Sequence, residues 1–401
     1  MDFVESLKVS FGALRSNKMR AALTMLGVII GVTAVIMLIS LGEGAKKYIQ
    51  DQFVGIGSNL LIITPGKLET RGGPFPAGET VHRITYGDAE AIKKHCRSVI
   101  EVVPVIIGAS SVKYANRSRD TTVIGVTENF PRVRNLHVEI GSFFKEEDVD
   151  AKRRVVVLGR RVKTELFRES NPLGQWVSIG EMKFRVIGIM ERKGVSLGFD
   201  IDDLVFIPVR TAQELFDVDR LFEIIAQAKS EKDVDTAKEE IVYLLSKRHD
   251  NNEDFTVTSQ AAILSSLLTI LDVFTWVLGG IAAISLLVGG VGIMNIMLVS
   301  VSERTKEIGV RKAVGARRGD IMYQFVIEAV VLSVSGGAFG ILFGNLGAFG
   351  LRAVIPALPV TVSLWTVLLG FFFSAGVGIF FGVYPAYKAS GLNPIDALRY
   401  E

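Results

Sequence analysis

The side chains that most often bind metals are sparse in this sequence. The four histidines share no i, i+3 or i, i+4 spacing: His82, His95, His137 and His249. The single cysteine, Cys96, directly follows one of them, but neighbouring residues of a helix point to different faces. A metal site needs several ligands that converge on one point. We therefore expect no bound metal.

One short pattern matches the nucleophile of an enzyme. The segment GVSLG at residues 194–198 fits the G-x-S-x-G elbow of serine hydrolases. That elbow needs a strand before the serine and a helix directly after it. The sequence FDIDDLVFIPV follows instead, which is typical of a loop and a strand, and Ser196 has no His or Asp partner at a readable spacing. The pattern favours an ordinary loop, a membrane-anchored hydrolase is the weakest interpretation, and no residue is predicted to be catalytic.

Nine charged residues lie in SVSERTKEIGVRKAVGARRGDI, residues 300–321, between two apolar runs. Glu307 and Arg311 have the i, i+4 spacing that stabilises a helix by a few tenths of a kcal/mol, and Glu303 and Lys306 have the i, i+3 spacing. Ile308 and Val314 give the predicted helix a partly apolar side. Gly309 costs about 1 kcal/mol inside a helix, which predicts close approach by another backbone. Gly315 is predicted to end the helix, and Asp320 to cap the next one.

The long elements around this segment are predicted to lie in a membrane. The chain has 401 residues, of which 49% are hydrophobic and 22% charged, and its mean hydropathy is +0.38. Four runs carry no charge at all: residues 21–42, 273–302, 329–351 and 353–387. A span needs roughly 20 apolar residues. We expect an α-helical membrane protein with four transmembrane helices; a soluble protein with four buried helices is the alternative.

Lys and Arg residues set the predicted topology. They are concentrated in residues 1–20 and 302–325, whereas residues 351–362 contain only Arg352. Positively charged short loops stay in the cytoplasm. Both termini and the charged segment are therefore predicted to be cytoplasmic, in a multi-pass protein of the bacterial inner (plasma) membrane. The first span is predicted to remain as an anchor, because its apolar run is too long for a signal peptide.

The predicted order of segments follows from these runs. Residues 1–20 are expected to form a cytoplasmic amphipathic helix, either in the membrane interface or packed on protein. A large extracytoplasmic (periplasmic) α+β domain at 54–258 is inserted between the first and second transmembrane helices, since its runs alternate between β-rich and amphipathic helical patterns. The other expected segments are a first helix with an outer extension at 21–53, a stalk and second span at 259–301, a coupling loop or helix at 302–325, spans at 326–350 and 363–384, and a cytoplasmic tail at 385–401.

Small residues follow the spacing of helix contacts within the spans. Glycines at i, i+4 let helix backbones approach closely in lipid, and an asparagine in a span is expected to bond a neighbouring helix. The residues predicted to pack the spans are Gly27, Gly31, Asn295, Gly336, Gly340 and Gly344. No span has an ionisable residue in its interior, which argues against a proton- or ion-coupled secondary transporter.

Several long stretches resemble one family. ALRSNKMRAALTMLGVIIGVTAVIMLISLGEGA, GGVGIMNIMLVSVSERTKEIGVRKAVGARRGDIMYQFVIEA and the closing YPAYKASGLNPIDALRYE are similar to MacB/FtsX-type permeases of ATP-binding-cassette (ABC) systems, in the macrolide-exporter branch. The resemblance runs from residue 11 to 401. It implies a homodimer with a two-lobed outer domain that long helices move when ATP-driven closure occurs in the cytoplasm.

The resemblance also assigns a role to the charged segment, which by composition alone is only a positive-inside loop. It implies that the predicted helix couples the permease to an ATPase through Glu303, Arg304, Lys306, Glu307, Gly309, Arg311, Lys312 and Gly315. No G-x-x-x-x-G-K-[ST] phosphate loop occurs in these residues. We therefore expect a non-catalytic subunit without a cofactor, whose separate ABC ATPase partner binds ATP and Mg.

The expected function is export of a drug, a peptide or a lipoprotein-like substrate, with a periplasmic adaptor (membrane-fusion) protein and membrane lipid as further partners. The alternative is a non-transporting regulator, in which ATPase-driven motion activates an outside partner such as a cell-wall hydrolase. The net charge of +3 is too small to predict nucleic acid as a partner.

Overall fold

The computed structural model describes residues 18–54, 59–66, 84–196, 199–252, 254–355, 359–360 and 362–399. The chain divides into two compact units, which are described separately below. The membrane unit comprises Met1–Tyr48 and Leu268–Glu401, and the outer unit comprises Ile49–Leu267. The amphipathic helix expected at residues 1–20 lies outside the described residues, apart from the three that begin the first long helix.

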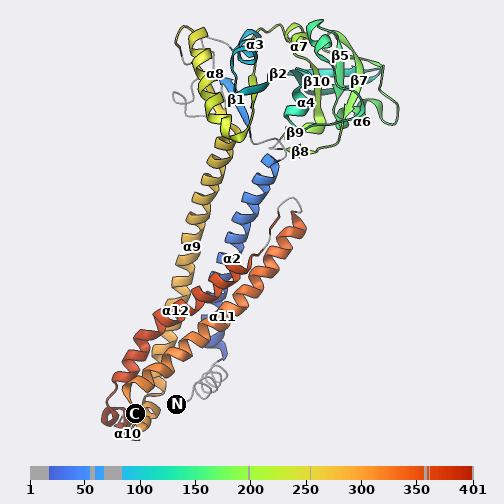
Figure 1. Cartoon of the computed structure of the whole chain (residues 1–401). Coiled ribbons are helices and arrows are strands. Elements are labelled where there is room, and N and C mark those ends of the chain that lie inside the picture. The colour runs from blue at the N-terminus through green and yellow to red at the C-terminus, as the bar shows by residue number, and fades with distance from the viewer. Residues whose placement is uncertain are drawn as a thin grey trace. The chain divides into compact units, whose positions relative to one another are not determined.

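The membrane unit is built from helices (Figure 1). They are α2 (Lys18–Val54), α9 (Gln260–Glu303), α10 (Thr305–Ala313), α11 (Arg318–Val354), α12 (Leu364–Gly391) and α13 (Pro394–Arg399). Four of them are long and apolar enough to cross a membrane: α2, α9, α11 and α12. The predicted fold class is therefore confirmed. Helix α12 continues through Pro385 to Gly391, so the first residues of the tail predicted at 385–401 are helical.

One face of α2 packs into a row of glycines on α11. Val28, Val32 and Ile36 recur every four residues and are fully buried. A Cβ atom added to Gly340 would lie only 2.7 Å from the Cβ of Val32, and one added to Gly344 would lie 2.9 Å from Cγ2 of Ile36. Real Cβ atoms do not approach this closely, so the absence of a side chain at these positions sets the distance between the two helices.

The first lobe of the outer unit is a split β-α-β-β-α-β arrangement. Its elements are β1 (Leu60–Pro65), α3 (Tyr86–His95), β2 (Val99–Tyr114), β11 (Glu223–Ala228), α8 (Val234–Arg248) and β12 (Phe255–Ser259). The strand order is β12-β1-β11-β2, and every neighbouring pair is antiparallel. Helices α3 and α8 pack on this sheet and are joined by an ion pair between Asp88 and Arg248, with 2.7 Å between Oδ1 and Nε.

The second lobe is inserted between β2 and β11 of the first. Its strands are β3 (Arg117–Val126), β4 (Val138–Gly141), β5 (Val155–Leu158), β6 (Trp176–Ile179), β7 (Met182–Met190), β8 (Val195–Ser196), β9 (Phe199–Asp200) and β10 (Leu204–Pro208). Its helices are α4 (Phe130–Val133), α5 (Glu146–Asp150), α6 (Arg160–Phe167) and α7 (Val209–Phe216), with a 3-10 turn at Ile201–Asp203 and another at Glu231–Asp233 before α8. The order β2-β3-β10-β5-β7-β4 includes two parallel pairs, β3 with β10 and β5 with β7.

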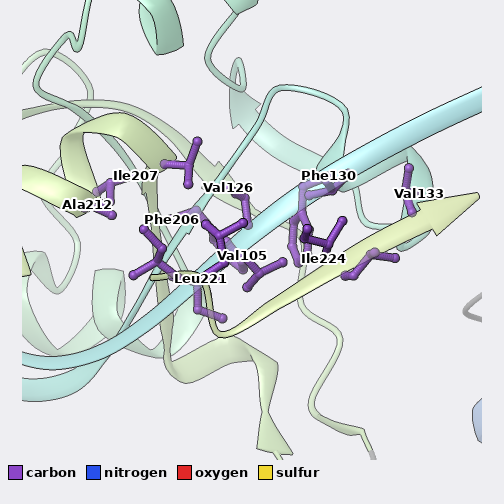
Figure 2. Packing of buried hydrophobic residues seen from close by; sticks show 14 of the residues in the cluster. Val105, Val126, Phe130, Val133, Phe206, Ile207, Ala212, Leu221 and Ile224 are labelled. Atoms are coloured by element: carbon purple, nitrogen blue, oxygen red, sulfur yellow. The ribbon is translucent and has the colours of Figure 1, made fainter. Parts of the chain in front are cut away.

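Strand β2 belongs to both lobes. Its first half pairs with β11 and its second half pairs with β3. One hydrophobic core accordingly continues from lobe to lobe, as Figure 2 shows for Val105, Ile224, Phe130 and Phe206. The rings of Phe130 and Phe206 lie 5.7 Å apart, centroid to centroid. The outer unit is therefore an α+β domain of two lobes with a shared core.

A largely buried ion pair crosses the junction between the lobes. Arg134, which caps α4, places Nη2 3.4 Å from Oε1 of Glu223 on β11. Burial raises the pKa of the Glu223 carboxyl and lowers the pKa of the Arg134 guanidinium, while each group opposes the shift of the other. Nearby, Arg132 pairs with Glu101 of β2, but its side chain is 67% exposed.

We predict that Arg134→Met lowers the free energy of unfolding of the outer unit by about 3 kcal/mol, because it leaves a buried carboxylate unpaired. The full chain in detergent is titrated with urea and followed by the fluorescence of Trp176, the tryptophan of the outer unit. The folded-state pKa of Glu223 is already raised and rises further without Arg134. The destabilisation is thus largest above that pKa and shrinks as the pH falls to the range where the unfolded carboxyl is protonated.

Arg132→Met is the matched control on the same short helix, since Arg132 is 67% exposed and water can take its place beside Glu101, so the expected loss is about 0.5 kcal/mol or less. The double variant Arg134→Met/Glu223→Met is expected to regain most of the lost stability. Equal destabilisation by the Arg132 and Arg134 variants would contradict the assignment of the buried pair.

Candidate coupling site

The charged segment forms a helix of its own. Helix α9 ends at Glu303, Arg304 has the non-helical backbone angles of an N-cap, and α10 begins at Thr305. The Thr305 hydroxyl donates back to the carbonyls of Val301 and Ser302. Glu303 and Lys306 therefore lie on different helices, and the single helix predicted to carry both of them is interrupted at Arg304.

The inner face of α10 packs against the C-terminal helix α13. Ile308 and Gly309 are buried, and a Cβ atom on Gly309 would lie 2.8 Å from the Cβ of Ala397. The close approach predicted from a glycine inside a helix is thus made by α13. Figure 1 shows α10 at the end of α9, beside the end of α12 that leads into α13.

Lys312 fastens α10 to the end of α12. Its ammonium group donates to the carbonyl of Leu392 at 2.7 Å and to the carbonyl of Ser390. The last carbonyls of a helix have no partner within it, and a lysine there also interacts favourably with the helix dipole. Burial, with a smaller contribution from the nearby Arg318, lowers the pKa of Lys312. Lys312 therefore connects α10 to the end of α12.

Two arginines connect the segment to α11. Arg311 donates to Oε1 of Gln324 at 2.9 Å and pairs with Glu307 on its own helix. Arg304 lies 3.5 Å from Glu328, whose carboxylate is almost completely buried. The side chains of both arginines are about one quarter exposed, so their positive charges interact mainly with groups of the same chain.

Gly315 ends α10 as its sequence position predicts. Its φ of +108° is accessible chiefly to glycine. The N–H of Gly315 donates to the carbonyl of Lys312, and the N–H of Ala316 donates to the carbonyl of Arg311. These two bonds form a Schellman motif. Asp320, predicted as the next cap, instead occupies the third position of α11 and accepts from the N–H of Arg317.

The exposed face of α10 combines charge with two valines. Lys306 and Glu307 are exposed, as are Val310 at 51% and Val314 at 84%. The sequence placed Ile308 and Val314 on one apolar side, but six residues of a helix separate them by about 240°, and only Ile308 is buried. Val310 was missed, although its i, i+4 spacing from Val314 marks an apolar stripe. On α13, Ile395 and Leu398 are also exposed.

The predicted packing glycines all lie at contacts between helices. A Cβ atom on Gly27 would lie 2.8 Å from the Cα of Gly289 on α9, and one on Gly31 would meet Leu286 on the same helix. Gly336, Gly340 and Gly344 face α2. Asn295 lies exposed on α9, where the described residues provide no hydrogen-bond partner for it. Gly289 itself was missed, because the glycine-rich run around it gave no single i, i+4 pair.

The hydrolase-like segment GVSLG lies partly outside the described residues, since Leu197 and Gly198 are not among them. Val195 and Ser196 form β8, which pairs with β9, and a 3-10 turn and β10 follow. No α-helix follows the serine directly in the described part of this segment. In the part of the chain that the structure describes, no group of three His, Cys, Asp or Glu side chains could hold a metal ion.

We predict that Gly309→Val separates α13 from α10, because the new Cβ overlaps the Ala397 side chain. Backbone amides of residues 394–399 are expected to exchange about tenfold faster in hydrogen-exchange mass spectrometry, which corresponds to about 1.4 kcal/mol of local opening. Gly319→Val is the control, since a Cβ atom there meets no neighbour within 4 Å. Unchanged exchange in the Gly309 variant would contradict this contact.

Known proteins match the chain in both units. The model of the MacB-like periplasmic core domain matches residues 21–244, and that of the FtsX-like permease C-terminal matches residues 279–394. The macrolide export ATP-binding/permease protein MacB of Bdellovibrio bacteriovorus is 40% identical over 406 residues, which cover 100% of this chain and 62% of that protein. The chain thus spans about three fifths of the length of the MacB relatives that it matches.

A second relative matches over the whole of both chains. The uncharacterized ABC transporter permease YknZ of Bacillus subtilis is 35% identical over 402 residues. Among solved structures, the periplasmic region of MacB from Actinobacillus actinomycetemcomitans is similar over 55% of this chain and 97% of that one, with a TM-score of 0.47 and 23% identity. The family models and the sequence relatives carry the assignment: this chain belongs to the MacB/FtsX-like family of ABC transporter permeases.

Proposed function

We propose that the chain is the permease subunit of an ABC-type efflux or mechanotransmission complex and that its ATPase docks on α10. The observation that carries the proposal is a short charged helix at the end of the 44-residue helix α9, fixed to the rest of the membrane unit but exposed on one face. A docking element must contact its partner and must also transmit the movement of that partner to the rest of the chain. Some residues of α10 contact other helices of the membrane unit, and others are exposed to a partner.

The anchoring residues are those that contact other helices. Arg304 and Arg311 hold α11, Lys312 holds the end of α12, and Gly309 admits α13. A force applied to α10 would therefore reach several helices without first deforming the contact. Gly315 forms the turn into α11.

The contact residues are those left on the exposed face. Lys306 and Glu307 offer charges that set orientation, and Val310 and Val314 offer apolar area that gains free energy when covered. Ile395 and Leu398 of α13 extend this apolar area. Apolar side chains in a polar rim are typical of an interface centre.

Helix α9 provides the route for movement. At 1.5 Å per residue it is about 66 Å long, roughly twice the thickness of the hydrocarbon core. Strand β12 of the outer unit ends at Ser259 and α9 begins at Gln260, without a linker between them. A displacement at the α10 end would reach the outer domain along one continuous helix.

The remaining parts of the proposal follow the family and the charge distribution. We place α10 and both termini in the cytoplasm of a bacterial inner membrane, since Lys and Arg are concentrated there. A separate ABC ATPase would bind ATP and Mg, an arrangement supported by YknZ, which is named a permease and matches this chain from end to end. A homodimer and a periplasmic adaptor would complete the complex, and the exported substrate would be a drug, a peptide or a lipoprotein-like molecule.

We predict that Val314→Glu lowers the stimulation of the partner ATPase by about tenfold, because a charge placed at the interface centre costs about 1 to 2 kcal/mol of docking free energy. The measurement is ATP hydrolysis by the ATPase with and without the chain in nanodiscs. Val354→Glu is the matched control, since that valine is 79% exposed at the other end of α11. Arg311→Glu is a less specific test, because it also breaks the contact with Gln324.

The same preparation tests the function itself. The ABC ATPase should co-purify with the unmodified chain and should be lost with Val314→Glu, while the elution volume of the permease stays the same. Full stimulation by the Val314 variant would exclude this face as the docking site. Failure of any ABC ATPase to co-purify would argue against the whole proposal.

A further inference from the structure

Helix α9 carries an apolar stripe that the described part of the membrane unit leaves uncovered. The stripe residues recur at alternating steps of four and three, which is the spacing of the a and d positions of a heptad repeat. Each of its seven apolar residues is between 42% and 68% exposed. In chain order they are Ile270, Phe274, Val277, Ile281, Ile284, Val288 and Val291, and the next position of the repeat is Asn295.

The stripe lies on the side of α9 that faces away from α2. Leu286 is buried against α2 and, at 100° per residue, lies about 200° around the helix from its stripe neighbours Ile284 and Val288. Asp272, which pairs with Lys46 of α2, lies on the same side of α9 as Leu286. The stripe is therefore free to contact another helix, and two such stripes can meet without bringing like charges together.

Lipid does not account for the outer end of the stripe. Counted outward from Glu303, roughly 20 residues cross the hydrocarbon core, and the ion pair of Lys46 with Asp272 marks a level at which charges are tolerated. Ile270 and Phe274 lie on either side of Asp272, and they are 51% and 61% exposed. Apolar side chains that are grouped and exposed outside the hydrocarbon core mark a contact with another protein.

Asn295 provides a second, independent indication. It is exposed in the uncharged stretch of α9, and its side chain has no hydrogen-bond partner among the described residues. Asn345 of α11 is also exposed, but it donates to the carbonyl of Ile341 on its own helix at 2.9 Å. An amide without a partner in lipid is unfavourable, and asparagine side chains in membranes bond across helices. At an a position of two parallel helices, each asparagine faces its counterpart and fixes the register.

We propose that α9 pairs along this stripe with α9 of a second copy of the chain, as a parallel left-handed coiled coil in which the two Asn295 amides hydrogen-bond to each other. The period of 3.5 residues gives the left-handed supercoil. Both copies enter the membrane in the same orientation, so a two-fold axis along the membrane normal places each stripe residue opposite its counterpart. The inference rests on the homodimer of the proposed function and assigns its contact surface.

The side-chain types of the stripe suit such a contact. All of its apolar residues except Phe274 are β-branched. In a helix these side chains have one strongly preferred χ1 rotamer, so packing them costs little conformational entropy. In lipid the association of helices depends on such packing and on hydrogen bonds between helices. Pairing of the two α9 helices provides both, whereas lipid alone would leave Asn295 without a partner.

Cysteine cross-linking of the full chain in native membranes tests the stripe. Single cysteines replace the four d positions, and the native Cys96 stays because it is buried. Counterpart Cα atoms at d positions would lie within the roughly 4.4–6.8 Å that a disulfide requires, so oxidation with copper phenanthroline should link at least about half of the chain into dimers at each position. The substitutions are Ile270→Cys, Val277→Cys, Ile284→Cys and Val291→Cys.

Trp276→Cys and Ala283→Cys are the matched controls. Each lies next to a stripe position and is exposed, but points away from the stripe. Less than about one tenth of the chain should be linked at these positions, because the counterpart cysteines would be too far apart for a disulfide. Unsubstituted chain, with Cys96 alone, should give no linked dimer.

Asn295→Val tests the register. Dimer dissociation is followed by energy transfer between fluorescent proteins fused to the C-terminus, as the full chain is diluted with lipid in vesicles. The variant should weaken the dimer by about three- to tenfold, since it removes a hydrogen bond between helices in the membrane. Asn345→Val is the matched control and should leave the dimer unchanged, because its amide bonds within its own helix.

Absence of linked dimers at the stripe positions, or equal linking at residues 276 and 283, would overturn the proposal. Linking at only one of the four stripe positions would show two helices that cross at a point and would overturn the coiled coil. An unchanged dimer in Asn295→Val would overturn the pairing of the asparagines. Co-purification of the ABC ATPase is measured on the same membranes: if it persists while the stripe fails to link, this inference fails and the proposed function stands.

Discussion

The closeness of helix backbones is the constraint on which the membrane unit depends. In lipid, an apolar side chain gains little by moving from the acyl chains to another helix, so association depends on tight packing. Helix α2 meets this condition on two sides, through Gly27 against Gly289 of α9 and through Val32 and Ile36 against the glycines of α11. Because each contact involves backbone atoms or the base of a side chain, the helices cannot slide without opening several contacts together.

This packing explains why α10 can be small and still be held in place. Nine residues bury too little area for independent stability. Helix α10 is instead attached at three points by residues whose own helices are already fixed: Gln324, Glu328 and the carbonyls at the end of α12. Most of the positively charged side chains of this segment interact with these groups of the same chain. What remains exposed is a narrow face that carries Lys306, Glu307, Val310 and Val314.

The sequence was most informative where a single physical requirement acts. Four uncharged runs required four membrane helices, Gly309 required a close neighbour, and Gly315 required a helix end, and the structure contains each of them. Which side chains of α10 contact other helices and which stay exposed could not be predicted, because this depends on tertiary partners. Lys312 and Lys306 have the same chemistry in the sequence, yet one caps α12 and the other is exposed. The break at Arg304 also has no local signal, since the residues around it are all compatible with a helix, and it places Glu303 and Lys306 on different helices.

The same limit applies to the outer unit, where short β-rich runs identified an α+β domain but not its insertion. Strand β2 has 16 residues, and nothing in its composition shows that its halves pair with different sheets. The insertion brings together residues that are distant in the chain, such as Arg134 with Glu223 and Lys93 with Glu146. The lobes are joined by the buried pair of Arg134 and Glu223 at one place and by the ion pairs that α3 makes with α5 and α7 at another. Charged residues of the outer unit, which the sequence analysis did not single out, thus take part in joining the two lobes.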